Sequence, residues 1–378
     1  MTRFKSPFWE ALGIFWGMII GSGMFALPYA VSVSGLLASL ITAFLAVFAV
    51  LSVHLAYGEI VMRTPGRHRL PGYVRLYLGK FAGDVNKISE VIFFNVTLLI
   101  YGVLGGIFLF TIFGGNAFYW TLIFFGVSSL ILFFEGIEKI GFLNFILIIP
   151  LVATILIISL LALEKGGAAS INFYGRDPFF AFGIFVFALT GLSVIPDAMD
   201  VFKNGEEKKS LKKVITLGTL MPLILYVIFV FAILTSVNGL VSEDSISSLE
   251  GILGRSAVIL GAAVGFIAVF TSFLVLAYDL RQIYRLDLRM PLFYSGILSV
   301  AVPIGLFLLG LTDFLKMVSI VGGAFIALDG FFVIFILRKI RKTGPGDIKF
   351  LSFGWLHQLL LFLTFLGSIL YEIVYQIL

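Results

Sequence analysis

The sequence predicts an all-α integral membrane protein with about eleven transmembrane helices. Of its 378 residues, 60% are hydrophobic and only 12% are charged, whereas soluble domains are about 25% charged. Apolar runs of about 20 residues, the length with which a helix crosses a bilayer, recur along almost the whole chain. The composition therefore excludes an ordinary soluble protein and makes the lipid bilayer the expected surroundings.

Short connections separate the expected spans, and none of them is long enough for a soluble domain. The spans are 9–36, 37–62, 85–113, 117–134, 140–163, 178–202, 211–237, 255–283, 291–309, 314–337 and 354–377. The segment 71–80, which carries tyrosine and basic residues, predicts a short helix at the cytoplasmic membrane surface. The chain contains no cysteine, which excludes disulfides and cysteine-based metal sites.

Lys and Arg gather in alternate connections, and this pattern predicts the orientation of the chain. They cluster after the second, sixth, eighth and tenth spans, whereas the connection after the seventh span carries Glu243 and Asp244. Basic connections stay on the cytoplasmic side of a membrane. We therefore expect a multi-pass protein of the cell (plasma) membrane, with the N-terminus (Arg3 and Lys5) in the cytoplasm and Leu378 outside. The net charge of +5 is then a topology signal, and no nucleic-acid partner is expected.

Two interruptions by glycine and proline fall inside segments that otherwise read as unbroken membrane helices. Gly23 precedes Pro28, and Gly191 precedes Pro196, with the same spacing in both segments. Glycine lacks a Cβ and proline lacks an amide hydrogen, so both leave backbone groups unpaired, and lipid offers these groups no partner. Close helix packing and simple kinks are the alternative explanation, but the matched spacing favours a binding site.

The two interrupted spans occupy corresponding places in the chain, because the first and sixth spans each open a set of five. The two sets run in opposite directions through the membrane, a pattern typical of transporters with inverted repeats. One transporter domain over 1–378 is therefore expected. It would hold a first repeat at 9–163, a second repeat at 178–337 and an extra C-terminal helix at 354–377.

The backbone of an interrupted helix offers two kinds of ligand. The amides of Ser22, Gly23 and Met24 would open the second half-helix of the first span, and such an N-terminus attracts a carboxylate. The carbonyls at Met18 to Ile20 would end the first half-helix and suit an ammonium group or a metal cation. Together these groups predict a site for a zwitterion.

At these residues the chain resembles a known family. GMIIGSGMFALP at 17–28 and FALTGLSVIPD at 187–197 are similar to motifs of amino acid permeases of the amino acid/auxin (hydroxy/aromatic amino acid) type. This type belongs to the amino acid–polyamine–organocation superfamily, which has the LeuT-like fold. The topology matches over all eleven spans, whereas the motifs match in the first, sixth and, more weakly, eighth spans. The resemblance implies a 5+5 inverted repeat with broken helices one and six.

The resemblance also implies the activity, namely secondary active transport of an amino acid by alternating access. No cofactor or enzymatic step is implied, and the sequence contains neither a GxxxxGK[ST] loop nor an HExxH motif. A membrane sensor that binds an amino acid without moving it is the alternative from another class. The oligomeric state is not predicted.

The resemblance assigns roles to residues of several spans. The backbone of 21–23 would hold the substrate carboxylate, and the stretch 190–193 would receive the amine and part of the side chain. Tyr101 would close over the substrate from outside, with Phe187 as its partner. The expected substrate-binding residues are Ile20, Gly21, Ser22, Gly23, Met24, Asn95, Tyr101, Phe187, Thr190, Gly191, Leu192 and Ser193.

A coupling ion is implied by the eighth span, where Ala268, Thr271 and Ser272 fall on one helix face. In sodium-coupled proteins with this fold, such a face joins carbonyls of the first span, here those of Gly17 and Ile20. Oxygen ligands of this kind suit an alkali cation, so Na⁺ is the expected coupling ion. The alternative is that the hydroxyls only bond back to their own helix.

A proton-coupled amino acid permease, or an exchanger of another small organic solute, is the alternative within transport. Proton-coupled relatives can carry a lysine on the fifth span, and none lies within that span here. Ionisable groups at membrane depth are costly and often functional, which makes Asp197 and Asp329 candidates for a titrating role. Glu59 is expected to pair with nearby basic residues, His54 to be packed and hydrogen-bonded, and Glu372 to be solvated near the outer surface.

Overall fold

The computed structural model describes residues 6–66, 68–134, 137–166, 171–237, 241–343, 348–352 and 354–377. All regular structure in these ranges is helical, and they contain no strand. Arg3, Lys5 and Leu378, on which the expected orientation of the two ends depends, lie outside the described residues.

The spans of the first half of the chain agree with the hydropathy pattern. Their helices are α1 (Pro7–Ile19) and α2 (Gly23–Ser34), α3 (Leu36–Arg63), α5 (Lys80–Phe113), α6 (Ala117–Phe134) and α7 (Ile137–Lys165). The short helix α4 (Leu70–Leu78) lies between α3 and α5, as predicted for 71–80. It begins at a proline in the first turn and ends at Gly79, whose φ of 96° suits glycine.

The second half follows the same order. The sixth span consists of α8 (Phe180–Leu189), the single turn η1 (Leu192–Val194) and α9 (Ile195–Asp200). The later spans are α11 (Leu211–Ser236), α13 (Arg255–Gln282) with η3 (Ile283–Asp287), α14 (Leu292–Leu308), α15 (Phe314–Ile320) with η4 (Val321–Phe325) and α16 (Ile326–Thr343), and α17 (Trp355–Tyr371) with η5 (Glu372–Ile377). The short elements α10 (Gly205–Lys208), η2 (Ser247–Leu249) and α12 (Glu250–Leu253) lie in connections.

The prediction of about eleven spans is confirmed. Within the described residues, eight helices are long and apolar enough to cross a membrane, and the bent pair α1–α2 makes a ninth. The remaining two predicted spans correspond to the shorter apolar helices α6 and α14. The chain is therefore a multi-pass helical membrane protein.

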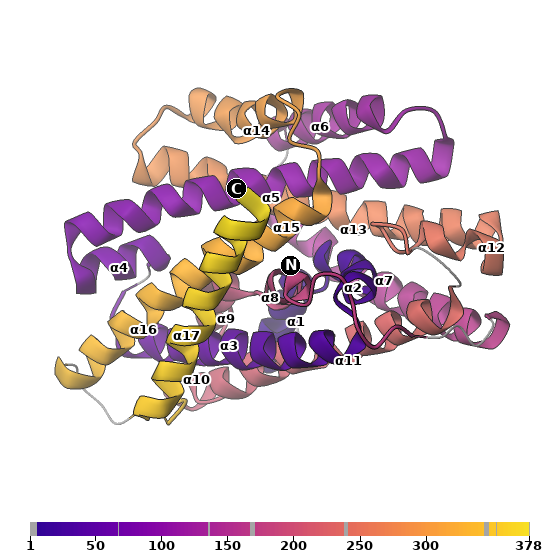
Figure 1. The fold of residues 1–378 in the computed structure, drawn as a ribbon. Coiled ribbons are helices and arrows are strands. Elements are labelled where there is room, and N and C mark those ends of the chain that lie inside the picture. Colours follow the sequence, from indigo (N-terminus) through magenta and orange to yellow (C-terminus); the bar gives the residue numbers. More distant parts are fainter. Residues whose placement is uncertain are drawn as a thin grey trace.

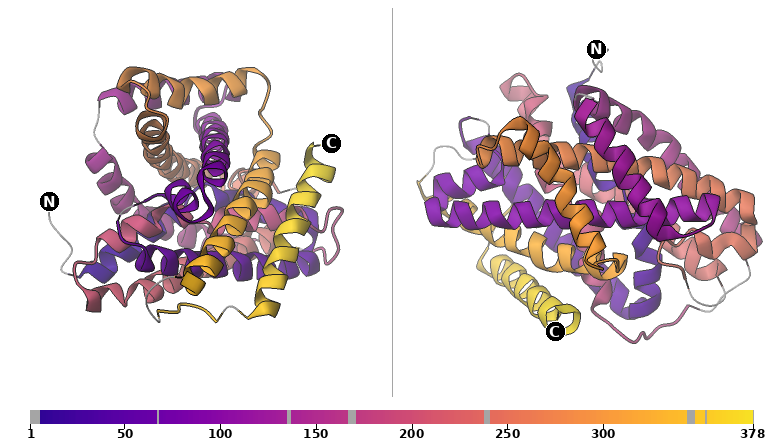
Figure 2. Two further views of the ribbon diagram at one scale, coloured as in Figure 1. Left: turned by 90° about the vertical axis from the view of Figure 1, so that its left-hand side faces the viewer. Right: turned by 90° about the horizontal axis from the view of Figure 1, so that it is seen from above.

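The broken helices lie in the middle of the molecule (Figure 1). On one side α11 packs against α1 and α2, and α3 packs against α8 and α9. On the other side lie α5 and α13, which are covered by α6 and α14. Figure 2 shows α17 on the outside of the bundle, where it packs against α16 and η4. The interrupted segments thus lie deep in protein and not against lipid, as non-helical backbone at membrane depth requires.

The expectation that Glu372 is solvated is wrong. Its side chain is fully buried, and its Oε1 accepts a hydrogen bond of 2.8 Å from the Ser319 hydroxyl. The carboxyl group lies against Gly183 of α8 and Gly323 of η4, where an added Cβ would approach Oε1 to 2.9 Å and 2.4 Å. The position of a residue near the end of a span predicts how deep it lies in the membrane. Whether its side chain reaches water also depends on which face of the helix carries it.

Candidate functional site

The first interruption separates two half-helices that meet at an angle. Helix α1 ends at Ile19 and α2 begins at Gly23, and their axes differ by 51°. Ser22 occupies the N-cap position of α2 without a side-chain capping bond. Its hydroxyl is buried and has no hydrogen-bond partner within the described residues. The N-terminus of α2 therefore presents its first backbone N–H groups and a hydroxyl inside the bundle.

The two prolines of the motifs lie in helices and not at the unwound residues. Pro28 is inside α2, so the first interruption spans only residues 20–22. Pro196 lies in the first turn of α9, where a missing N–H costs no hydrogen bond. The unwound part of the second interruption is Thr190, which is extended, and Gly191. Glycine and proline thus mark both interruptions, but glycine is the residue at which the chain unwinds.

Tyr226 of α11 holds both interruptions. Its hydroxyl lies 2.7 Å from the carbonyl oxygen of Ile19 and 3.1 Å from that of Ala188, and it donates its hydrogen to these two acceptors. A tyrosine has one hydroxyl hydrogen, so the two broken helices share a single donor. Tyr226 is not among the predicted site residues. The available signal is a tyrosine in the middle of an apolar span, because a buried hydroxyl needs a partner.

His54 of α3 holds the second interruption from the other side. The Gly191 N–H donates to His54 Nε2 over 3.0 Å, and His54 Nδ1 lies 2.9 Å from the Thr219 hydroxyl. Because Nε2 accepts a hydrogen bond, we infer that the ring proton is on Nδ1 and is donated to Thr219. The Thr219 hydroxyl in turn donates to the carbonyl of Ile215. The prediction that His54 is packed and hydrogen-bonded is confirmed.

Several predicted residues lie together at the first interruption. Tyr101 of α5 lies beside Ser22. A Cβ added to Gly21 would lie 3.9 Å from the Ser272 hydroxyl, so α13 faces the same residues. Asn95 differs, because its amide group donates to the carbonyl of Val91 and to the Tyr284 hydroxyl over 3.0 Å. Asn95 therefore contacts the end of the eighth span, and no described hydrogen bond joins it to the interruptions.

Gly23 also has the packing role that was considered as the alternative explanation for the glycines. A Cβ added at this position would lie 2.6 Å from the Cα of Ala188. Such an approach is too close for any residue but glycine, so α2 and α8 cross with their backbones in contact. The carbonyl-rich and amide-rich ends of the two broken helices are brought together by this crossing.

The face of α13 that is expected to hold a cation is buried. Ala268, Thr271 and Ser272 are 6%, 1% and 8% exposed. The Thr271 hydroxyl lies 3.1 Å from the carbonyls of Ile267 and Ala268, which is the backbone bonding considered as the alternative. A hydroxyl that donates its hydrogen still has lone pairs for a cation, so this bonding is compatible with a cation site.

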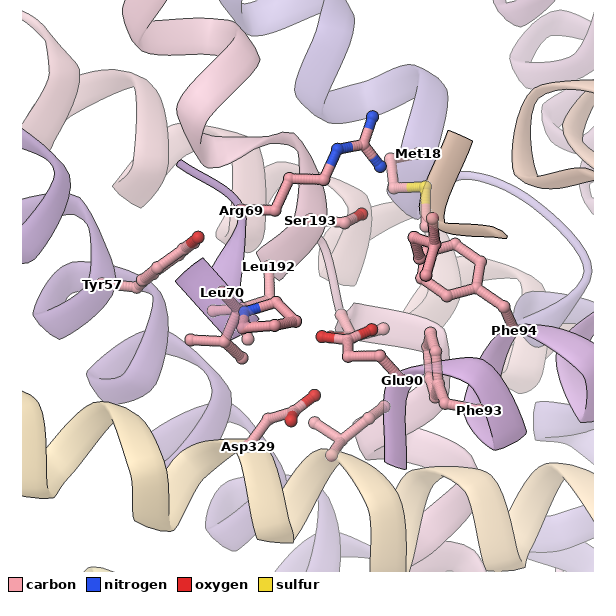
Figure 3. Close-up of a pocket in the computed structure, with 14 residues that line it drawn as sticks. Met18, Tyr57, Arg69, Leu70, Glu90, Phe93, Phe94, Leu192, Ser193 and Asp329 are labelled. Carbon is pink, nitrogen blue, oxygen red and sulfur yellow. The ribbon is translucent and has the colours of Figure 1, made fainter. Parts of the chain in front are cut away.

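A cavity lies between the second interruption and α4 (Figure 3). It is lined by Met18, Tyr57, Arg69, Leu70, Pro71, Glu90, Phe93, Phe94, Thr190, Leu192, Ser193, Ile283, Ile326 and Asp329. Ser193 lies in η1, between the two halves of the broken sixth span, and it is nevertheless exposed. The cavity thus brings three of the predicted substrate residues together with Asp329. It also adds Glu90 and Arg69, which are not among the predicted site residues.

One ion pair and one hydrogen bond hold charged groups at this cavity. Arg69 Nη2 lies 2.9 Å from Asp279 Oδ1. Burial acts to lower the pKa of Arg69, but the Asp279 carboxylate outweighs it, so the pKa is raised and the guanidinium stays charged. Asp329 accepts a hydrogen bond of 2.9 Å from the Asn86 amide. Asp197 on α9 does not line the cavity and has an interaction of its own.

Glu59 makes the structural pairing that was expected of it. Its carboxylate lies 3.1 Å from Arg63 Nε and accepts a hydrogen bond of 2.8 Å from Arg341 Nε. The backbone N–H of Phe350 adds a further bond of 3.0 Å. Glu59 is completely buried, and the two arginines compensate for the loss of water. This cluster fastens α3 to α16 and to the segment after it.

Comparison with known proteins agrees with this architecture. The family model described as Amino acid permease matches residues 7–288. None of the curated proteins compared with the chain matches it. Among solved structures, MhsT in complex with L-phenylalanine is 17% identical, with a TM-score of 0.65 and 98% of both chains covered.

Two further solved structures have the same fold. Mhp1, a nucleobase-cation-symport-1 family transporter with bromovinylhydantoin bound, is 18% identical, with a TM-score of 0.64, 98% of this chain covered and 92% of that one. A Na⁺-coupled sialic acid symporter is 13% identical, with a TM-score of 0.61, 98% of this chain covered and 90% of that one. The chain belongs to the amino acid permease family of the amino acid–polyamine–organocation superfamily, and it is a permease with the LeuT-like fold, not an enzyme.

Proposed function

We propose that this transporter carries an amino acid, with the substrate carboxylate at the N-terminus of α2 and the ammonium group at the carbonyl ends of α1 and α8. The single observation that carries this proposal is the N-terminus of α2. It begins inside the bundle at Gly23, next to a buried Ser22 hydroxyl that no described residue satisfies. Partial positive charge and free donors at a helix N-terminus favour a carboxylate.

The remaining proposed substrate residues surround this point. Ile20, Gly21 and Met24 supply backbone groups of the first interruption, and Tyr101 lies beside Ser22. Thr190, Gly191, Leu192 and Ser193 supply the second interruption, and three of them line the cavity. Phe187 is buried one turn before it. Asn95 stays a prediction, with Tyr284 as its described partner.

We propose sodium as a coupling ion at Gly17, Ile20, Ala268, Thr271 and Ser272. The approach of the Ser272 hydroxyl to Gly21 supports this placement, because it brings the α13 face to the carbonyl end of α1. The sialic acid symporter with the same fold is described as Na⁺-coupled. Hydroxyl and carbonyl oxygens suit a hard alkali cation.

Transport would follow from rocking of one part of the bundle against the other. The first, second, sixth and seventh spans would move as one body against the third, fourth, eighth and ninth. The repeats 9–163 and 178–337 would supply corresponding parts of each body. The Lys- and Arg-rich connections would face the cytoplasm of a cell with the protein in its plasma membrane. The Arg69–Asp279 pair joins the link before α4 to α13, and we assign it to closure on that side.

A screen of the twenty amino acids tests this function. Purified protein is mixed with each amino acid, with sodium or with choline, and its thermal stability and its uptake in proteoliposomes are measured. Saturable uptake of one side-chain class that needs sodium supports both proposals. Full uptake in choline refutes sodium coupling, and stable binding without accumulation under any ion gradient favours a sensor.

A further inference from the structure

Two carboxyl groups from different spans reach the same cavity. Glu90 lies on α5 and Asp329 on α16, and both line the space below the second interruption. Figure 3 shows the two side chains directed into this space from neighbouring walls. Asp329 is only 7% exposed. Carboxylates at membrane depth are costly unless they are paired or neutralised.

One cation among the described lining residues faces several carboxylates. Arg69 lies on the link before α4, where its charge acts on Glu90, but its ion pair, at 2.9 Å, is with Asp279 of α13. From α3 the cavity is lined by Tyr57 and from η1 by Ser193, which carry no positive charge. Within the described part of the chain, the Glu90 carboxylate has no ion pair or hydrogen bond. The cavity would hold excess negative charge if both carboxyls were ionised, and Asp197 on α9 adds to it near Tyr57.

The Asn86 side chain lies next to Asp329, and its amide oxygen has no hydrogen-bond donor among the described residues. It lies one turn before Glu90 on the same face of α5, at the i, i+4 spacing. Its Nδ2 donates to Asp329 Oδ1 over 2.9 Å. Its Oδ1, in a side chain that is fully buried, has no donor within the described residues. A buried amide oxygen needs a donor, and a protonated carboxyl beside it would supply one.

We propose that Glu90 and Asp329 form a proton-binding pair, and that the proton is a second ion coupled to amino acid transport. Two carboxyls in one site do not both ionise without a compensating charge, and one shared proton removes the repulsion. The proton adds to a carboxylate oxygen when the cavity faces one side and leaves from it when the cavity faces the other. No bond between heavy atoms changes, and no electron is transferred. The coupling part rests on the proposed function.

The position of the pair explains how its exposure would change during transport. One wall of the cavity comes from Met18, Tyr57 and the residues of the second interruption, which belong to the body proposed to rock. The lining also contains Glu90 on α5 and Ile283 in η3, directly after α13, which belong to the other body. Movement between the two bodies would open or close this cavity. The pair would therefore exchange its proton in one conformation and retain it in the other.

The coupling is tested with Glu90→Gln and Asp329→Asn in proteoliposomes. Sodium is equal on both sides, the membrane potential is clamped, and a tenfold proton gradient is imposed while the twenty radiolabelled amino acids are supplied as a mixture. One proton per substrate changes the steady-state accumulation of the wild type by up to about tenfold. Both variants should show no change while still exchanging substrate. Glu164→Gln is the matched control, since Glu164 is exposed at the end of α7 and should behave as wild type.

A second measurement needs no substrate. Infrared difference spectra of the purified wild type between acidic and alkaline buffers should show the carbonyl band of a protonated carboxyl, which Glu164→Gln keeps and either pair variant loses. Loss of this band on adding sodium at constant pH would overturn the proposal in favour of a metal cation site. A band that survives in both variants, or accumulation in them that still follows the proton gradient, would also overturn it. Absence of all amino acid uptake would refute the proposed function alone, because the infrared result stands without it.

Discussion

Alanine at Gly21 and alanine at Gly23 are expected to have different effects, although the two glycines are two residues apart. At Gly23 the added Cβ would lie 2.6 Å from Ala188 Cα and 3.1 Å from its backbone nitrogen. Backbone atoms of a packed helix cannot move aside as a side chain can, so α2 and α8 must separate. Overpacking of this kind costs about 1–3 kcal/mol. Gly23→Ala should therefore lower the thermal unfolding midpoint by several degrees.

At Gly21 the same change meets almost no resistance. The nearest atoms to the added Cβ would be the Met18 carbonyl oxygen and the Ser272 hydroxyl, both at 3.9 Å, which is ordinary van der Waals contact. The fold should keep its stability. The methyl group would, however, occupy the space between α1 and α13 in which we place the substrate and the cation. We expect substrate affinity to fall by about tenfold, or ~1.4 kcal/mol.

Thermal unfolding and equilibrium binding of a radiolabelled amino acid, measured on both purified variants, separate the two effects. The expected pattern is a stable Gly21→Ala protein that binds weakly and a less stable Gly23→Ala protein. If Gly21→Ala binds like the wild type, the substrate does not lie at this interruption. If Gly23→Ala is as stable as the wild type, the backbone contact with Ala188 does not limit the approach of α2 and α8.

Three further predictions concern single contacts. Tyr226→Phe leaves two buried carbonyls without their donor and should cost about 1–3 kcal/mol in thermal unfolding, whereas Tyr119→Phe at an exposed position should cost nothing measurable. Thr271→Val combined with Ser272→Ala should weaken the sodium dependence of uptake more than its maximal rate, and an unchanged sodium dependence would remove these hydroxyls from the cation site. Glu59→Gln leaves two arginines without their carboxylate and should lower the free energy of unfolding by about 3–5 kcal/mol. A protein destabilised by this amount should give a low yield of monodisperse material on purification, and a normal yield would contradict a structural role for Glu59.

The interruptions and the spans could be predicted because their signals are local. Gly21, Gly23 and Gly191 stand out because glycine destabilises the interior of a helix. The spans follow from the hydropathy of the sequence. Glu90 could not be singled out in the same way. It lies only a few residues inside the predicted third span, where a solvated carboxylate is expected, and its cavity is formed by α16 and the link before α4. Only the packing of distant segments shows that its surroundings are shared with Asp329.

The two interruptions differ in which of their polar groups already have hydrogen-bond partners. At the second interruption the Gly191 N–H is already bonded to His54 Nε2, and the Ala188 carbonyl lies within reach of the Tyr226 hydroxyl. At the first interruption the N-cap of α2 has no side-chain bond, and the Ser22 hydroxyl has no described partner. The two motifs look alike in sequence, but at the second one His54 accepts the hydrogen bond of the Gly191 N–H, which is then not available to a substrate. This difference supports our proposal that the carboxylate binds at the first interruption. A His54→Phe variant, which frees the Gly191 N–H, should lose stability without moving the carboxylate, whereas Gly21→Ala should weaken binding in both backgrounds.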